Sequence, residues 1–271
     1  MRSTKWTLLT ALGLSLAAGP ALAAACGTNA AGFDRWLAAF RKQAVAKGIS
    51  RRTLDQAFRG VRYNKTVIRL DRSQRSFKLS FRQFYARRVS RAMIAQGRKR
   101  IKRHARTLAR IEKRFGVPAP VLVSIWGLET GYGRNSGRMP VIRSLATLAY
   151  DCRRSAFFTN ELMSALKIIQ RGDMRPARMR GAWAGEIGQT QFLASSYVKY
   201  AVDFDGDGRR DLIRSVPDVL ASTANYLRAH GWRRGAPWGP GSANYTVLAQ
   251  WNRASVYQKT IARMANAMAG R

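Results

Sequence analysis

The fold is decided by the stretch Val121-Leu-Val-Ser-Ile-Trp-Gly-Leu-Glu129-Thr-Gly-Tyr-Gly133, in which an apolar run ends on a carboxylate. The run predicts a buried helix, with Pro118 suited to its first turn and the glycines marking its end. Desolvation and the negative end of the helix dipole both oppose a charge on Glu129, so both raise its pKa. A carboxylic acid that stays protonated near neutral pH can act as a general acid. For an isolated Glu, the alternative is an ordinary surface carboxylate at a helix end.

Helical periodicity continues on both sides of this stretch. Apolar residues from Phe33 to Ala44 predict a helix that ends at Gly48, and Ser50 caps a second helix. Residues 60–80 lack a clear period and are predicted to be irregular, whereas residues 81–115 form a long basic helical region. Further helices are expected at about 141–150, 155–171, 194–201, 217–229 and 255–268. Strand alternation is scarce, so the predicted fold class is mainly α (α+β), with at most a small sheet or hairpin.

The chain of 271 residues has room for one large domain or two small ones, and its charge is strongly positive. It carries 49 Lys and Arg against 14 Asp and Glu, a formal net charge of +35. Such a charge attracts anionic partners, which include nucleic acid, anionic lipid surfaces and cell-wall polymers.

The N-terminus indicates where the protein works. Arg2 and Lys5 precede an apolar stretch from Trp6 to Ala18, and Ala21-Leu-Ala23 is a small-residue cleavage site. This pattern predicts a secretory signal peptide, residues 1–23, which is too short for a membrane-spanning helix. The mature chain, residues 24–271, is therefore expected outside the cytoplasm, and export weakens the nucleic-acid interpretation.

Cys26 and Cys152 are the only cysteines. In an oxidising compartment, an even count suggests a disulfide. A lipobox with an acylated Cys26 is an alternative, although the usual leucine three residues earlier is missing. Two free buried thiols are a third interpretation.

Several common catalytic sites find no support in the sequence. The two histidines, His104 and His230, are not accompanied by a G-x-S-x-G elbow. Two His and two Cys at these separations do not supply a zinc site, and neither a P-loop nor a dinucleotide fingerprint is present.

The aspartates crowd into one loop, Asp203-Phe-Asp205-Gly-Asp207-Gly. Aspartates at positions 1, 3 and 5 with a turn glycine are typical of the start of an EF-hand calcium loop. Position 12 is Arg214, not a carboxylate, but Asp218 four residues later can close an enlarged loop. The interpretations are a structural Ca²⁺ and a solvated turn. The predicted metal set is Asp203, Asp205, Asp207, Arg209 and Asp218.

These residues and several further motifs resemble the lytic murein transglycosylases of the B type. The resemblance covers about Phe33 to Met268. The motifs that carry it are Trp126-Gly-Leu-Glu129-Thr-Gly-Tyr-Gly133, Gly181-Ala-Trp-Ala-Gly185, Gly188-Gln-Thr-Gln191-Phe192, Ser195-Ser-Tyr197, Asp203-Phe-Asp-Gly-Asp-Gly208, Ala224-Asn-Tyr226 and Trp251-Asn252 with Tyr257. Two departures are Ala194, where the family often has Pro, and Ala182, where some members have a groove serine.

The resemblance implies a fold with a lysozyme-like catalytic lobe at about 116–271, an added N-terminal helical part at about 30–115, and a substrate groove between lobes. It implies non-hydrolytic cleavage of the MurNAc–GlcNAc β-1,4 bond of peptidoglycan, leaving 1,6-anhydro-MurNAc ends. Glu129 matches the single catalytic acid/base, and the aspartate loop matches an enlarged metal-binding loop. The residues matching positions that line the saccharide groove are Tyr85, Gln191, Tyr226, Asn252 and Tyr257.

The implied partners are peptidoglycan glycan strands and not nucleic acid, and no transmembrane segment is expected. The resemblance also implies a periplasmic monomer whose chemistry requires no cofactor. Ordinary glycosidases use two carboxylates. Glu186 is the one nearby candidate for the second, and a structural or groove-rim role for it is the alternative. Two other functions remain open, namely a hydrolytic muramidase that uses the same Glu and a non-catalytic basic protein that binds cell wall or nucleic acid.

Overall fold

The computed structural model describes residues 25–73 and 79–270, and the predicted signal peptide lies outside these residues. The described part of the chain is helical apart from one small two-stranded sheet, which confirms the predicted fold class. The elements are α1 (Phe33–Ala46), α2 (Arg51–Ala57), α3 (Lys65–Arg72), α4 (Phe81–Arg88), α5 (Arg91–Arg103), α6 (Ala105–Phe115), α7 (Ala119–Thr130), β1 (Met139–Pro140), α8 (Val141–Tyr150), α9 (Ser155–Gln170), the 3-10 helix η1 (Pro176–Arg178), β2 (Arg180–Gly181), α10 (Ala194–Tyr200), α11 (Val216–Ala229), α12 (Ala243–Trp251) and α13 (Ser255–Ala269).

The helices differ from the sequence-based expectation in three places, and only the irregular passage predicted at 60–80 is wrong. Residues 60–80 contain α3, in which only Val67 and Asp71 are buried, so its apolar period is too weak to recognise. The region 81–115 is three helices, because the chain turns at Val89–Ser90 and again at His104. Helix α12 was not expected at all, although Ser242 accepts a hydrogen bond from the Tyr245 amide as an N-cap.

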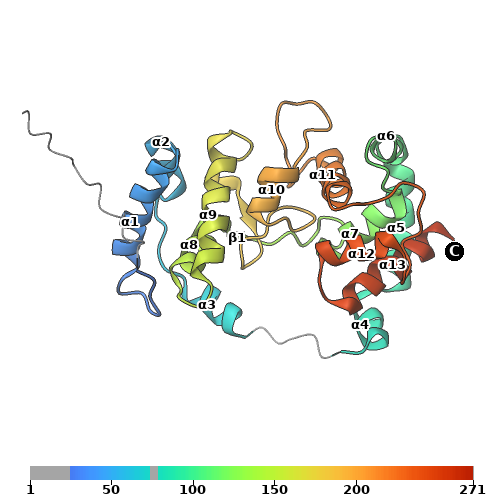
Figure 1. Cartoon of the computed structure of the whole chain (residues 1–271), viewed down its shortest axis with the longest axis horizontal. Coiled ribbons are helices and arrows are strands. Elements are labelled where there is room, and N and C mark those ends of the chain that lie inside the picture. Colours follow the sequence, from blue (N-terminus) through green and yellow to red (C-terminus); the bar gives the residue numbers. More distant parts are fainter. Residues whose placement is uncertain (1–24, 74–78, 271) are drawn as a thin grey trace, which may run out of the picture.

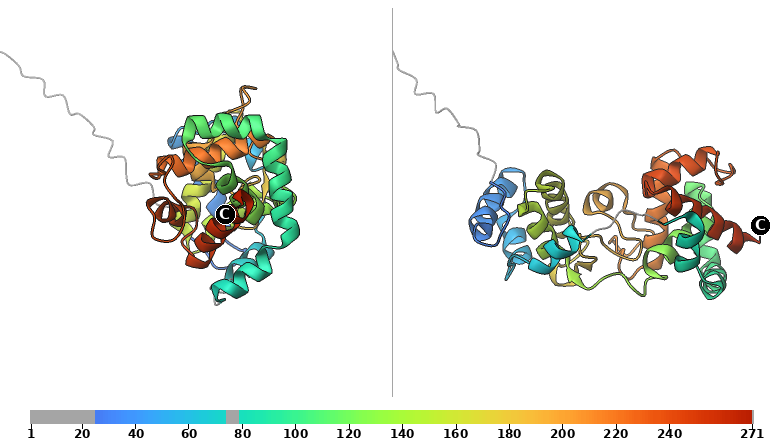
Figure 2. Two further views of the ribbon diagram at one scale, coloured as in Figure 1. Left: turned by 90° about the vertical axis from the view of Figure 1, so that its right-hand side faces the viewer. Right: turned by 90° about the horizontal axis from the view of Figure 1, so that it is seen from below.

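Most helices gather at two ends of an elongated molecule, and α10 lies between them (Figure 1). Helices α1, α2 and α3 pack against α8 and α9 at one end. At the other end α5, α6, α11 and α13 pack against α7, and α4 packs against α13. The view from below shows the same separation (Figure 2, right). The segment 30–115 is thus shared between both ends, and its assignment to one N-terminal part stays a prediction.

Helix α7 occupies the centre of the second end. It is buried on every side from Val121 to Leu128, as expected for a helix that is apolar all round. A Cβ at Gly127 would lie 2.9 Å from the Tyr132 ring and 3.0 Å from Met264 of α13, so glycine allows this close packing. Gly131 ends the helix with φ +61°, in the left-handed region that glycine adopts readily.

Two long-range connections hold the N-terminal helices to α8 and α9. The predicted disulfide is present and joins Cys26 to Cys152, in the turn between α8 and α9. Beside it, the buried Asp71 of α3 accepts hydrogen bonds from Arg153 and Arg154. Burial raises the pKa of Asp71, but the two arginine hydrogen bonds outweigh burial and leave that pKa below its usual value.

In the part of the chain that the structure describes, no helix combines the length and the apolar character needed to cross a lipid bilayer.

We expect reduction of the disulfide, or the double substitution Cys26→Ser/Cys152→Ser, to lower the free energy of unfolding by about 4–5 kcal/mol. The reason is that the cysteines are 126 positions apart, so the bond removes a large loop entropy from the unfolded chain. Denaturant titration with and without reductant measures the effect, and the double variant, which reductant cannot alter, is the control. Free thiols or a lipid mass on Cys26 in the native protein would contradict the bond.

Candidate active site

Glu129 lies in the last turn of α7, with its carboxyl group held from α12 and α13. Its Oε1 accepts a hydrogen bond of 2.9 Å from the indole Nε1 of Trp251 and one of 2.8 Å from the hydroxyl of Tyr257. The carboxyl group is therefore fixed by two aromatic donors more than a hundred residues away along the chain.

Burial is the main influence on the charge of Glu129 and raises its pKa above the usual value. The hydrogen bonds from Trp251 and Tyr257 and the positive charge of Arg88 lower the pKa, whereas the carboxyl group of Glu186 raises it, and the net shift is upward. The sequence-based expectation of a raised pKa is confirmed, with desolvation as the dominant cause. Such a group can deliver a proton.

Glu129 opens into a cleft of about 360 Å³. Its walls come from the end of α7, the loop between β2 and α10, and helices α10, α11 and α12. The residues that line it are Glu129, Ala182, Glu186, Gln191, Phe192, Leu193, Ser196, Tyr226, Gln250, Trp251 and Asn252.

The loop before α10 forms the floor of the cleft and is tightly folded. The backbones of Ile187 and Phe192 pair through two hydrogen bonds of 2.7 and 2.9 Å. Gln191 has φ +54°, unusual for a residue with a side chain, and its Nε2 donates to the carbonyls of Gly188 and Ser136. At Gly181 an added Cβ would lie 1.9 Å from the Glu186 carbonyl oxygen, so only glycine fits there.

Gln189 connects this loop to α7 and to the aspartate loop, and the sequence analysis did not single it out. Its Oε1 accepts a hydrogen bond of 2.8 Å from the Trp126 indole, and its Nε2 donates to the Ile213 carbonyl at 2.9 Å. Its own carbonyl accepts a bond of 2.6 Å from Thr130. Gln189 therefore fixes the cleft floor relative to the residue that follows Glu129. The motif Gly188-Gln-Thr-Gln191 was a signal for the loop but not for this residue.

Aromatic rings form one wall of the cleft. Tyr226 stacks on His230 with ring centres 4.1 Å apart and meets Trp251 edge-on at 5.1 Å. Its hydroxyl donates to the Gln250 carbonyl at 2.6 Å. The ring of Tyr226 is thus held firmly at the cleft, and its hydroxyl is already engaged with the backbone.

The structure brings most of the predicted site residues together. Glu129, Gln191, Tyr226 and Asn252 line the cleft, and Tyr257 is buried behind Glu129 as its hydrogen-bond donor. Tyr85 is not among the described residues that line this cleft. Tyr85 lies in α4, and the guanidinium carbon of Arg263 lies over its ring, 5.3 Å from the ring centre.

Sequence reasoning missed Trp251 as a partner of Glu129, and it left the place of Glu186 open. Glu186 lines the cleft, and burial raises its pKa. Its Oε2 is buried without a hydrogen-bond partner among the described residues. The neutral form of this carboxyl group is therefore favoured.

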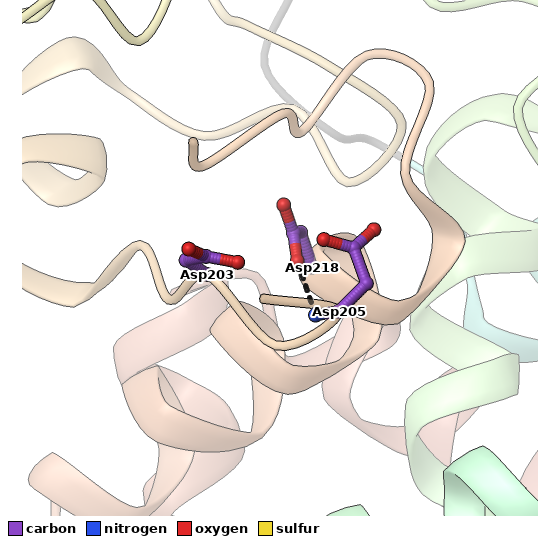
Figure 3. A group of neighbouring side chains, drawn as sticks. All are labelled: Asp203, Asp205 and Asp218. Carbon is purple, nitrogen blue, oxygen red and sulfur yellow. Dashed lines mark hydrogen bonds between the residues drawn. The ribbon is translucent and has the colours of Figure 1, made fainter. Parts of the chain in front are cut away.

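Three of the predicted metal ligands converge where the loop before α11 meets the first turn of that helix, which contains Asp218. Oxygens of Asp203, Asp205 and Asp218 lie within 4.8 Å of one another (Figure 3). Ca²⁺–oxygen distances of 2.3–2.6 Å place oxygens on opposite sides of an ion at about this separation. Asp207 is outside the group, and its Oδ1 accepts a hydrogen bond from the amide of Arg209. The three carboxylates therefore fit a hard cation, and the places of Asp207 and Arg209 stay predictions.

Comparison with known proteins identifies the family. A family model described as the transglycosylase SLT domain matches residues 32–242. The chain belongs to this family, which confirms the resemblance seen in the sequence motifs.

Individual relatives agree with this assignment. The chain is 42% identical, over 122 residues or 45% of its length, to membrane-bound lytic murein transglycosylase B of Escherichia coli (strain K12). That match spans 34% of the relative, about a third of its length. The structure of SltB3 from Pseudomonas aeruginosa in complex with NAG-anhNAM-pentapeptide is 35% identical with a TM-score of 0.84, covering 88% of this chain and 80% of that one.

A second structure confirms the lysozyme-like fold class. The Escherichia coli lytic transglycosylase Slt35 in complex with calcium has a TM-score of 0.76 at 23% identity, and the alignment covers 91% of this chain and 96% of that one. At this identity the likeness concerns the fold.

Proposed function

We propose that this protein is a lytic transglycosylase that cleaves the MurNAc–GlcNAc β-1,4 bond of peptidoglycan without water. The observation that carries the proposal is the setting of Glu129, a carboxyl group with a raised pKa that two aromatic donors hold at the edge of a cleft. Family membership supports the same activity. The ligand named for SltB3 supports a glycan strand that carries peptides as the substrate.

In the proposed reaction, protonated Glu129 first gives its proton to the glycosidic oxygen, and the bond from this oxygen to C1 of MurNAc breaks. The substrate's own N-acetyl oxygen stabilises the cation that develops at C1, as in substrate-assisted glycosidases. Glu129, now a carboxylate, takes the proton from the MurNAc 6-hydroxyl while that oxygen bonds to C1. The product is a 1,6-anhydro ring, and Glu129 returns to its protonated form.

The properties of Glu186 favour a scheme with Glu129 as the single acid over a mechanism that uses two carboxylates. A second catalytic carboxylate has to be ionised to act as nucleophile or base. Burial raises the pKa of Glu186 and favours its neutral form. We therefore assign Glu186 to the wall of the cleft rather than to the chemistry.

The location follows from two features. The sequence of residues 1–23 predicts export, and the disulfide is of the kind that persists in oxidising compartments. We propose a periplasmic, monomeric enzyme that acts on glycan strands.

Glu129→Gln is expected to lower turnover of purified peptidoglycan by at least about a hundredfold, the usual loss for a general acid. Glutamine keeps an oxygen that can accept the bonds from Trp251 and Tyr257, so the fold should persist. Glu112→Gln, which changes an exposed glutamate in α6, is the matched control. The loss in Glu186→Gln should be much smaller than that in Glu129→Gln. Near-normal turnover of Glu129→Gln would refute the assignment.

Mass spectrometry of the products separates the two reactions, because an anhydro product is lighter by one water than a hydrolytic product. The pH dependence is a second measurement. The reaction starts from protonated Glu129, so turnover should fall as pH rises through the pKa of Glu129. Because that pKa is raised, the fall should lie above the usual carboxyl value of 4.5.

We further propose that Asp203, Asp205 and Asp218 hold a structural Ca²⁺. Asp218 is fully buried, and burial raises its pKa, with the negative charge of Asp205 adding to the effect. A bound cation would offset this crowding of carboxylates. The aspartate loop leads into α11, which carries Tyr226. Gln189 also bonds to this loop, at the Ile213 carbonyl. A bound ion would therefore stabilise one side of the cleft.

Calcium should therefore raise the melting temperature of the wild-type protein. By mass action the gain in unfolding free energy is about 2.7 kcal/mol at a hundred times the dissociation constant. Asp205→Ala should abolish the rise, whereas Asp207→Ala tests whether a fourth aspartate contributes. An equal rise in the wild-type protein and in Asp205→Ala would show that the ion binds elsewhere.

A further inference from the structure

A second cleft, of about 760 Å³, is larger than the one at Glu129. It lies between the region of α2, the start of α8 and the segment that contains η1 and β2. Five arginines from separate parts of the chain line it, and none of the described lining residues is Asp or Glu. These are Arg52 and Arg59 in and after α2, Arg143 in α8, Arg175 before η1, and Arg180 in β2. We call it the arginine cleft.

The arginines of this cleft have no carboxylate partner in the described part of the chain, unlike the arginines beside the buried aspartates. Arg153 and Arg154 pair with the buried Asp71, and Arg171 pairs with the buried Asp173. Within residues 25–73 and 79–270, no ion pair involves any of the five cleft arginines. Positive charges gathered without a counter-charge are unfavourable, so an anion in the cleft would be attracted.

Two of the five arginines are held in place by the backbone. Arg143 donates from Nε to the Arg62 carbonyl at 3.0 Å, and Arg180 donates from Nη1 to the Arg138 carbonyl at 3.2 Å. A guanidinium has five N–H donors, so each of these side chains keeps several for a ligand. The start of α8, at Pro140 and Ile142, also lines the cleft and adds the positive end of a helix dipole.

The arginine cleft adjoins the cleft at Glu129 along the chain. Arg180 lines the arginine cleft, and Ala182, two residues later, lines the cleft at Glu129. Two residues span at most about 7 Å. The segment is rigid, since Arg180 pairs with Pro140 in the sheet and the Ala182 amide donates to the Glu186 carbonyl at 3.1 Å. The segment 180–182 thus contributes to the walls of both clefts.

We propose that the arginine cleft binds the carboxylates of the peptide carried by the glycan strand while the strand lies over Glu129. This inference rests on the proposed function and adds a peptide subsite to it. Arginine suits the task because its planar guanidinium matches a carboxylate with two parallel hydrogen bonds. The volume of the cleft allows several carboxylates along an extended peptide to be held at once. A chain of phosphates is the competing ligand, and the experiment separates the two.

The test measures binding in the Glu129→Gln protein, in which the substrate is expected to be consumed at least about a hundredfold more slowly. The probes are a GlcNAc-MurNAc oligomer that carries pentapeptides and the same oligomer without peptides. The peptide-bearing probe should bind more tightly. Adding Arg59→Gln and Arg175→Gln should weaken the binding of the peptide-bearing probe by about tenfold, since hydrogen bonds to charged groups are lost. The peptide-free probe should lose much less. Both arginines are exposed, so the protein should stay folded, which its melting temperature checks.

Arg35→Gln with Arg69→Gln is the matched control, because it removes the same charge from exposed positions on α1 and α3 that do not line the cleft. This control pair should keep the preference for the peptide-bearing probe. Equal losses for both probes, or the same loss in the control pair, would overturn the inference in favour of a general attraction to a basic surface.

Poly(glycerol phosphate) is the third probe. If the cleft substitutions weaken its binding and leave the preference for the peptide-bearing oligomer intact, the cleft is a phosphate site and the inference is wrong. If the protein binds neither oligomer and the wild type cleaves no peptidoglycan, the proposed function fails and takes the peptide subsite with it. If the cleft variant loses the preference for the peptide-bearing probe and the wild type cleaves peptidoglycan, the results support both the peptide subsite and the proposed function.

Discussion

The burial of one carboxyl group at the end of α7 is the constraint on which the rest of the site depends. A buried carboxyl group is unfavourable unless donors satisfy its oxygens, and the group prefers to be neutral. Trp251 and Tyr257 supply the donors to Glu129 without supplying a positive charge. The carboxyl group is thus held in place and keeps a raised pKa, which is the combination that a proton donor needs. Helix α13 must pack correctly on α7, and α12 on α13, for this contact to exist.

The surroundings of Glu129 are fixed by buried polar contacts more than by flexible surface groups. Gln189 bonds to Trp126, Thr130 and the Ile213 carbonyl, so its hydrogen bonds connect helix α7, the cleft floor and the aspartate loop. Glycines allow the close approaches this requires, as at Gly181. A cleft fixed in this way can orient a sugar before reaction, which is a large part of what an enzyme contributes.

The strong positive charge is distributed unevenly. Five of the few acidic residues are buried, namely Asp71, Asp151, Glu161, Asp173 and Asp218. They bind partly exposed arginines and backbone amides, or they crowd together with the aspartates of the aspartate loop. The outer surface is therefore more basic than the composition indicates. Such a surface concentrates anionic polymers near the protein, while the arginine cleft gives this attraction a defined place.

The sequence by itself determined those features that arise from local patterns. The apolar run before Glu129 predicted α7, and a regular apolar period predicted α8 and α9. The cysteine count, together with the export signal, predicted the disulfide. Helices α3 and α12 escaped prediction because few of their residues face the core. Only the tertiary structure decided that Trp251 lies against Glu129, that Asp207 stands apart from the other aspartates and that five arginines share one cleft. These contacts join residues far apart in the chain, and their partners are chosen by packing, which no local period encodes.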